Sequence, residues 1–291
     1  MSSLKQIWRI LCWNIRGLNN SDKWPLIYNK IEESLANIIC FQETKKGDID
    51  LKFLRNFVPK IFDCYAYIPS DGASGGLLVI WIGHQFLGRM LAHDCFGMVM
   101  EFTSKTTLDC FTLVNVYGPC DGIARDNFIA WLCSLDIQDD AHWLIIEDFN
   151  FYRYSDSRNR PSANLNDIET FNEVISYLGL IELPIKGRSY TWSNMQADPT
   201  LTQLDWFFTS HSWTLKYPNT LVNPLARPTS DHVPCVISIG TDIPKAQIFR
   251  FENHWIHMPG FMEVVRTYGK SIAREMLLNV FRASLNSLGK H

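Results

Sequence analysis

The fold is decided by an apolar run that ends in polar residues, Leu144-Ile145-Ile146-Glu147-Asp148-Phe149-Asn150. The first part of this run is short and rich in isoleucine, which is typical of a buried strand. The strand ends in two carboxylates and an amide. These groups suit a metal ion or a phosphate, so the run predicts a polar site at the end of a buried strand.

The same pattern recurs in five other segments. Apolar runs end in Asn14, in Gln42-Glu43 and in Tyr117, while Asp205 and Asp231-His232 precede further apolar runs. If these strand ends meet at one edge, they bring together carboxylates, a histidine and two asparagines. Packed carboxylates repel one another unless a cation lies among them, and oxygen ligands of this kind suit Mg²⁺ or Mn²⁺. A histidine beside them can transfer a proton near neutral pH.

Each of these residues also has a purely structural interpretation. Asp205 alone is typical of a turn or cap, Glu43 of a solvated strand end, and Tyr117 before Gly118-Pro119 of a strand terminator. Trp192 and Trp206 are more typical of a core or its rim than of a base-stacking surface. Only the whole set, in order and next to strands, favours a catalytic site.

Strands and helices are mixed along the chain. We expect strands at Ile7–Trp13, Ile38–Phe41, Leu77–Ile82, Met98–Phe102, Phe111–Tyr117, Trp143–Ile146, Leu204–Phe208 and Val233–Ile239. Helical spacing predicts helices at Trp24–Leu35, Phe128–Leu135 and Ile168–Leu178. The third, fourth and fifth strands resemble neighbours in hairpins, with Gly75-Gly76 in a turn. This order predicts an α/β fold of two packed mixed β-sheets flanked by helices.

Composition limits the domain plan and the function classes. The chain has 291 residues, of which 46% are hydrophobic, and this is enough for one large domain. We expect a domain at residues 1–240, a linker at 241–260 and an amphipathic C-terminal helix at 261–291. The formal net charge of −3 argues against a high-affinity nucleic-acid-binding module, but less against an enzyme whose carboxylates hold cations.

The cysteines and the apolar runs indicate where the protein works. None of the eight cysteines forms a C-x-x-C pair, so we expect buried free thiols in a reducing, intracellular compartment rather than a zinc cluster or a disulfide scaffold. No segment reaches the roughly 18 uninterrupted apolar residues of a membrane helix. We therefore expect a soluble protein with no membrane partner.

The order of motifs resembles a known superfamily. The motifs are Trp13-Asn14-Ile15-Arg16-Gly17-Leu18-Asn19, Phe41-Gln42-Glu43-Thr44-Lys45, Ser74-Gly75-Gly76, Asn115-Val116-Tyr117-Gly118-Pro119, Asp148-Phe149-Asn150, Tyr190-Thr191-Trp192-Ser193-Asn194, Leu204-Asp205 and Ser230-Asp231-His232. They resemble the endonuclease/exonuclease/phosphatase superfamily, which includes apurinic/apyrimidinic endonucleases and deoxyribonuclease I. The residues within these motifs are most similar to those of the endonuclease of plant LINE-type non-LTR retrotransposons.

The resemblance covers about Ile7 to Ile239 and implies a fold and a setting. It implies the four-layer α/β sandwich of deoxyribonuclease I and a nuclear location. Phe249–Trp255 resembles the stretch that leads toward a reverse transcriptase in such elements. We expect that domain to be absent from this chain.

The resemblance also implies a role for each matching position. Glu43 and Asp231 would bind Mg²⁺ or Mn²⁺, and Asn14 would steady the metal's waters or Asp148. The implied catalytic residues are Asp148, which orients or deprotonates the attacking water, Asn150, which helps it, His232, which is held by Asp205, and Tyr117. Asn14, Asn150 and His232 would contact the phosphate.

Three positions depart from the pattern of the superfamily. Glu147 stands where a glycine is usual, Trp206 where an arginine is common, and Gln203 where a basic residue is frequent. We expect Glu147 to crowd the site or repel phosphate, and Trp206 to remove a phosphate contact. All three changes add negative charge or remove positive charge.

The leading hypothesis is therefore a divalent-metal-dependent phosphodiesterase, a DNA endonuclease that nicks one strand and derives from a retroelement. One alternative is a catalytically impaired remnant that acts only as a binding module. The other is a phosphatase that acts on small phosphoesters.

Overall fold

The computed structural model describes residues 7–72, 75–120, 122–138, 140–160 and 164–240. These residues lie in one compact unit, Met1–Asp242. The expected linker at 241–260, the expected helix at 261–291 and Ser74 of the Ser-Gly-Gly motif lie outside the described residues.

The first sheet has six strands and is built around a parallel pair. Its order is β13 (Leu221–Pro224), β14 (Cys235–Ile239), β1 (Trp8–Asn14), β2 (Ile38–Gln42), β4 (Leu77–Trp81) and β3 (Cys64–Ile68). The strands β1 and β2 are parallel, with Asn14 beside Gln42, and the other pairs are antiparallel. The parallel pair therefore places Asn14 and the residue after Gln42 at the same edge of the sheet.

The second sheet repeats this arrangement. Its order is β5 (Phe86–Asp94), β6 (Gly97–Ser104), β7 (Cys110–Tyr117), β8 (Trp143–Asp148), β12 (Asp205–Thr209) and β9 (Ile181–Glu182). The strands β7 and β8 are parallel, with Tyr117 beside Asp148. Because β12 runs antiparallel to β8, its first residue, Asp205, also lies beside Asp148.

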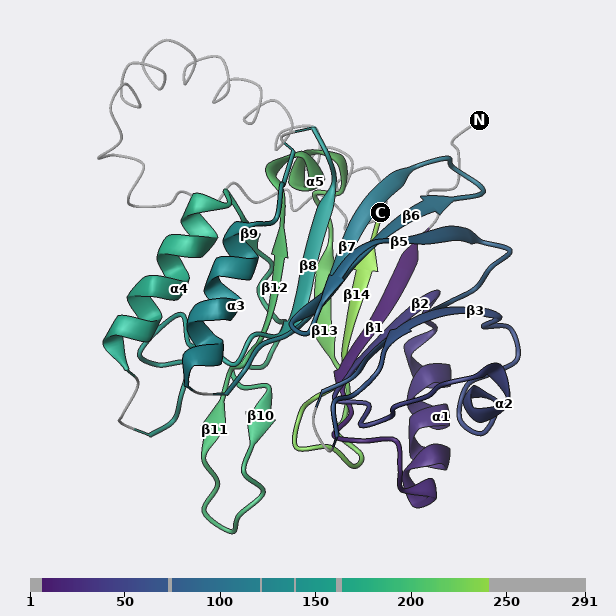
Figure 1. Cartoon of the computed structure of the whole chain (residues 1–291), viewed down its shortest axis with the longest axis horizontal. Helices are drawn as coiled ribbons and strands as arrows, with labels where there is room; N and C mark the ends of the chain where they lie inside the picture. The colour runs from purple at the N-terminus through teal and green to yellow at the C-terminus, as the bar shows by residue number, and fades with distance from the viewer. Residues whose placement is uncertain (1–6, 73–74, 121, 139, 161–163, 241–291) are drawn as a thin grey trace, which may run out of the picture. The chain divides into compact units, whose positions relative to one another are not determined.

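Helices cover the outer faces of both sheets (Figure 1). Helices α1 (Trp24–Ser34) and α2 (Leu51–Leu54) pack on the first sheet, and α3 (Ile123–Cys133) and α4 (Leu165–Tyr177) pack on the second. The remaining elements are η1 (Ser21–Lys23), α5 (His211–Lys216) and a small hairpin of β10 (Trp192–Ser193) and β11 (Leu201–Thr202). The predicted α/β fold of two packed mixed sheets between helices is confirmed.

The continuous apolar run of β8 follows from its position in the middle of these layers. Leu144 and Ile146 pack between the two sheets, while Trp143 and Ile145 pack under α3 and α4. A strand that is buried on both faces needs apolar residues at every position rather than at alternate ones. The apolar run stops near the carboxyl end of β8, where Asp148 is the last residue of the strand.

Two predictions about the strands and the cysteines are wrong in part. The strand β4 belongs to the first sheet, so it does not form a hairpin with β6; β6 pairs with β7, as predicted, and with β5, which was not predicted. All eight cysteines are thiols rather than disulfides, as predicted. However, only three of them are buried, Cys12, Cys40 and Cys235, whereas Cys95, Cys110, Cys120 and Cys133 are exposed because they lie in loops or at the ends of elements.

Within the described ranges, no helix has the length and apolarity needed to cross a bilayer.

Candidate active site

The two sheets are joined at one edge by a hydrogen bond between their central strands. The side chain of Asn14, at the end of β1, donates from Nδ2 to Oδ2 of Asp148, at the end of β8, over 2.8 Å. Both residues are 1% exposed. Ser230 holds the same end of β1, because its hydroxyl donates to the backbone carbonyl of Asn14 over 2.7 Å. The predicted convergence of distant strand ends is therefore present.

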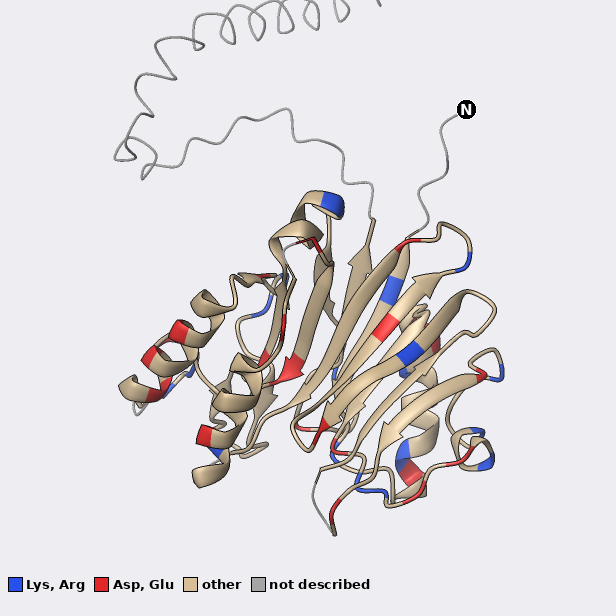
Figure 2. Ribbon diagram, turned by 45° about the horizontal axis from the view of Figure 1, so that its top comes forward, with Lys and Arg blue, Asp and Glu red and all other residues tan. Residues whose placement is uncertain are grey.

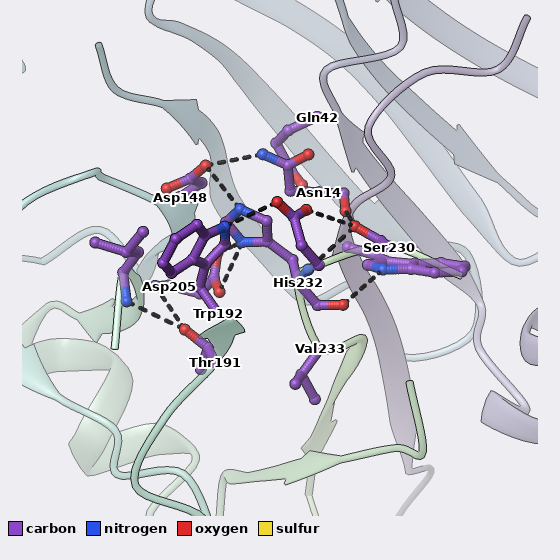
Figure 3. A network of polar contacts seen from close by, with 12 residues as sticks. Asn14, Gln42, Asp148, Thr191, Trp192, Asp205, Ser230, His232 and Val233 are labelled. Atoms are coloured by element: carbon purple, nitrogen blue, oxygen red, sulfur yellow. Dashed lines mark hydrogen bonds and ion pairs between the residues drawn. The ribbon is translucent and has the colours of Figure 1, made fainter. Parts of the chain in front are cut away.

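A buried histidine completes this network (Figure 3). Nδ1 of His232 lies 3.1 Å from each carboxyl oxygen of Asp205, and its Nε2 lies 3.7 Å from Oδ2 of Asp148. The backbone N–H of Asp205 donates to the hydroxyl of Thr191, which fixes the start of β12. Asp205 thus holds one ring nitrogen of His232, and the other faces Asp148.

The network shifts the pKa values of two of its members. Burial raises the pKa of Asp148 to about 7, although the neighbouring His232 partly offsets this rise. Burial alone would lower the pKa of His232, but Asp205 and Asp148 outweigh it and raise this pKa to about 9. Near neutral pH, Asp148 can therefore accept a proton while His232 carries one.

Glu43 lies next to this network and is held by a tyrosine. The hydroxyl of Tyr117 donates to Oε1 of Glu43 over 2.6 Å. Burial and this hydrogen bond raise the pKa of Tyr117, so it remains a protonated donor. Gly76 packs against Thr44, the residue after Glu43, so closely that a Cβ at position 76 would lie 2.3 Å from the Thr44 hydroxyl. Tyr117 is thus held beside Glu43, and its role at the phosphate stays a prediction.

Basic side chains bring Glu43 and Asp231 together. Nε of Arg16 lies 3.4 Å from Oε2 of Glu43, and its terminal nitrogen lies 3.0 Å from Oδ2 of Asp231. Nζ of Lys45 also lies 3.5 Å from Oε2 of Glu43. The indole N–H of Trp192 donates to Oδ2 of Asp231 over 2.9 Å. Trp192 is therefore a half-buried residue at the rim that orients a carboxylate.

Asn150 contacts the network from the loop after β8. Its backbone N–H lies 3.2 Å from Oδ1 of Asp148, and its side-chain amide donates to the carbonyl of Gly118 over 2.7 Å. A Cβ at Gly118 would lie 2.2 Å from the carbonyl oxygen of Phe149, so only glycine fits this close approach. The role of Asn150 in phosphate binding stays a prediction.

Two groups of side chains could hold a metal ion. Asp148, Asp205 and His232 offer ligand atoms that all lie within 4.8 Å of one another, but hydrogen bonds already use most of these atoms. Glu43 and Asp231, the predicted ligands, offer carboxylate oxygens, and Oε2 of Glu43 is buried without a hydrogen bond. The hard oxygen ligands of this second group fit Mg²⁺ or Mn²⁺ better than a set that contains imidazole.

A cavity of about 290 Å³ lies beside Asn150. Its lining includes Trp192 and Thr202 of the small hairpin and the cationic side chains of Arg125 and Arg158. Over the rest of the described fold, acidic and basic positions are interspersed (Figure 2). The cationic side chains that could attract a phosphate are therefore Arg125 and Arg158 beside the site, and not a continuous basic surface of the described fold.

Comparisons with known proteins support the fold. No family model matches the chain. An uncharacterized 149 kDa protein of transposon TX1 from Xenopus laevis is 23% identical over 179 residues, which are 58% of this chain and 14% of that protein. The chain thus matches about one seventh of the length of this curated relative.

Solved structures match over more of the chain. An AP endonuclease from Leishmania major has a TM-score of 0.62 at 14% identity and covers 81% of this chain and 88% of its own. The endonuclease domain of TRAS1, a telomere-specific non-LTR retrotransposon, has a TM-score of 0.61 at 13% identity and covers 81% of this chain and 100% of its own. This chain has the endonuclease/exonuclease/phosphatase fold.

Glu147 is the departure from the superfamily pattern that affects the site. Its φ of +95° lies in a region that favours glycine, and its side chain is 1% exposed. Neither carboxyl oxygen has a hydrogen-bond partner with good distance and angle, although the backbone N–H of Asn14 is near enough to lower the pKa of Glu147. Burial, Asp205 and Asp148 raise its pKa. Glu147 thus places a buried carboxyl close to Asp148 and Asp205 of the candidate site.

The interpretation of Trp206 as a lost phosphate contact is wrong. Because side chains alternate along β12, Asp205 faces the site while Trp206 lies in the layer under α3 and α4, where it is fully buried. Its indole N–H donates to the carbonyl of Phe151 over 2.9 Å. Gln203 is half-buried, and its backbone N–H donates to Ser157.

Several residues of the candidate site have an unusual backbone conformation. Arg16, Glu43, Lys45, Glu147 and Asn150 all have positive φ values. Non-glycine residues in this region are strained, and such strain concentrates at functional sites. The backbone therefore identifies this edge of the sheets independently of the side chains.

Sequence reasoning missed three residues that position the candidate site. Arg16 lies within a motif that was recognised, but it received no role; the Gly17 that follows it signals a turn that could direct its side chain back to Glu43. Thr191 and Ser230 act through hydroxyl hydrogen bonds to the backbone of Asp205 and Asn14, which lie elsewhere in the sequence. No local pattern reveals such bonds.

Proposed function

We propose that this chain is a divalent-metal-dependent phosphodiesterase, specifically a DNA endonuclease that nicks one strand and derives from a retroelement. The observation that carries the proposal is the buried network of Asn14, Asp148, His232 and Asp205. Four segments distant in the sequence supply a proton acceptor, a proton donor and the groups that orient them.

Asp148 is the group that orients and deprotonates the attacking water. Its pKa of about 7 allows it to accept a proton near neutral pH. The amide of Asn14 holds one carboxyl oxygen of Asp148, and the backbone N–H of Asn150 lies near the other. These contacts fix the direction from which the water approaches the phosphorus.

His232 is the group that donates to a non-bridging phosphate oxygen. Its pKa of about 9 keeps it protonated, and Asp205 stabilises the imidazolium and fixes the ring. Donors that are already in position stabilise the negative charge that develops in the transition state. Tyr117 stays protonated and supports the same phosphate from the side of Glu43.

Glu43 and Asp231 are the residues that would hold Mg²⁺ or Mn²⁺. When bound, the ion would neutralise these carboxylates and stabilise the departing 3′ oxygen. The buried Oε2 of Glu43, which has ion pairs with Arg16 and Lys45 but no hydrogen bond, supports this assignment.

The likeness to the TRAS1 endonuclease domain and to AP endonucleases supports DNA as the substrate. The cavity beside Asn150, with Arg125 in its lining, supplies a cation next to the proposed path of the phosphate backbone. A nuclear location remains part of this proposal and follows from the resemblance to retroelements.

The test is conversion of supercoiled plasmid to the open circle with Mg²⁺ or Mn²⁺. We expect nicking that stops with chelator and that falls at least about 100-fold in His232→Ala, because a positioned proton donor contributes this much. His93→Ala is the matched control, since His93 is exposed on β5. No metal-dependent nicking by folded protein, or faster turnover of a soluble phosphoester than of DNA, contradicts the proposal.

Glu147 favours a second candidate, a binding module that has lost catalysis. Its buried carboxyl interacts with Asp148 and Asp205 and fills space behind the site that a glycine would leave open. On this account the native chain does not nick DNA, and Glu147→Gly restores nicking. If that variant also fails to nick, Glu147 is not the cause of inactivity.

A further inference from the structure

Arg16 occupies the place where the proposed metal ion would neutralise charge. Its guanidinium touches both proposed ligands, at 3.4 Å from Glu43 and 3.0 Å from Asp231. These two carboxylates are largely buried, with side chains 11% and 16% exposed. Two such carboxylates at one edge repel each other unless a cation lies between them. In this structure, the bridging cation is a side chain of the protein itself.

The Arg16 side chain can leave this position. It is 45% exposed, so solvent can take over its hydrogen bonds when it moves. The polar contacts that hold its guanidinium are those with Glu43 and Asp231, whereas its backbone is fixed separately by the bond from its N–H to the side chain of Asn14. A swing of the side chain therefore requires no change in the strand ends.

We propose that Arg16 is an exchangeable internal cation that competes with the divalent ion for Glu43 and Asp231. This inference rests on the proposed function, because it assumes that these carboxylates are the ligands. The arginine keeps the carboxylates together before the ion binds, and it must withdraw for the ion to take their oxygens. Its presence weakens metal binding, since the ion must displace one positive charge and share the site with another, Lys45.

The test measures metal binding without DNA. Mn²⁺ is titrated into the full chain, and free Mn²⁺ is followed by electron paramagnetic resonance. We expect Arg16→Gln to bind Mn²⁺ at least about tenfold more tightly than wild type, because it removes a unit charge a few ångströms from the ion. Arg89→Gln is the matched control, since Arg89 pairs with Glu101 on the surface of β5 and β6. It should leave the affinity unchanged.

A second measurement does not depend on a variant. Titration of the native chain with Mg²⁺ should shift the guanidinium Nε–H signal of Arg16 in nuclear magnetic resonance spectra, while that of Arg89 stays in place. Equal or weaker Mn²⁺ binding by Arg16→Gln, or an Arg16 signal that does not move, overturns the inference. If the native chain nicks DNA in either of these cases, the proposed function stands and only the competition is wrong. If neither protein binds Mn²⁺ and no nicking occurs, both are wrong.

Discussion

Replacing Glu147 with glycine should stabilise the folded protein. Glu147 combines a φ of +95° with a fully buried carboxyl that has no hydrogen-bond partner. Positive φ costs a non-glycine residue on the order of 1–3 kcal/mol. A buried polar group without a partner costs roughly 1–3 kcal/mol more. Glycine removes both costs.

Two opposing effects reduce this gain. Each of the two buried methylene groups of the side chain contributes about 0.8 kcal/mol of stability. Glycine also loses more conformational freedom on folding, which costs roughly 0.5–1 kcal/mol. We expect a net gain of about 2 kcal/mol at neutral pH, or a rise in Tm of roughly 4–8 °C for a domain of this size.

The gain should grow with pH. Because the pKa of Glu147 is raised in the folded state, the folded protein keeps a proton that the unfolded chain releases above its own lower pKa. Wild-type stability therefore falls as pH rises above the unfolded pKa, by up to about 1.4 kcal/mol per pH unit. Glycine removes this contribution, so the difference between the two proteins is smaller near pH 4.5 than near pH 7.

The assay is urea unfolding of both proteins, followed by tryptophan fluorescence at the two pH values. Glu147→Gln removes the ionisable group but keeps the strain and the buried polar group, so its gain should be smaller and confined to the pH-dependent part. Leu108→Gly is the control for strain alone: it relieves a positive φ on the surface and should raise stability by about 1 kcal/mol at both pH values. A Glu147→Gly protein that is less stable than wild type, or a gain that does not vary with pH, refutes the reasoning.

Three further predictions concern the site and its support. Trp206→Arg should destabilise the fold by roughly 3–5 kcal/mol in urea unfolding and should not increase nicking, because it removes a large buried side chain and buries a charge; wild-type stability would contradict this. The imidazole of His232 should titrate near pH 9 by nuclear magnetic resonance, and at lower pH in Asp205→Asn. Because the pKa of His232 is raised in the folded state, its contribution to stability is complete below the unfolded pKa and is lost as pH rises through about 9. Asn14→Ala should raise the pKa of Asp148 further, because the amide donor that lowers it is lost, and should move the acidic limb of the nicking profile to higher pH; an unmoved limb would contradict this role.

The architecture could be predicted where burial imposes a pattern on the sequence. The apolar runs of β1, β2, β7 and β8 are buried on both faces, and each predicted strand lies within a residue or two of its observed bounds. The strand β3 was missed because all five of its residues are half-buried, which leaves no apolar pattern. The strand β5 was missed because it is mostly exposed at the edge of its sheet and has a bulge after Met90.

The candidate site could be predicted as a set of residues but not as a set of contacts. Asp148 and Asp205 were identified because they follow or precede apolar runs, and the sheet register places them side by side. The direction of a side chain depends on backbone detail that a motif does not carry. Side chains alternate along β12, so Trp206 points away from the site. Glu147 has a positive φ, and its carboxyl lies close to Asp148 and Asp205. Arg16 received no role because its two partners are distant in the sequence.

The position of a bound ion tests the central claim most directly. Crystals of the full chain soaked in Mn²⁺ would show the ion by its anomalous scattering. The account predicts a peak at roughly 2.0–2.6 Å from carboxylate oxygens of both Glu43 and Asp231, the range for hard cations with oxygen ligands. A peak among Asp148, Asp205 and His232, or no peak at Mn²⁺ concentrations that support nicking, would contradict it.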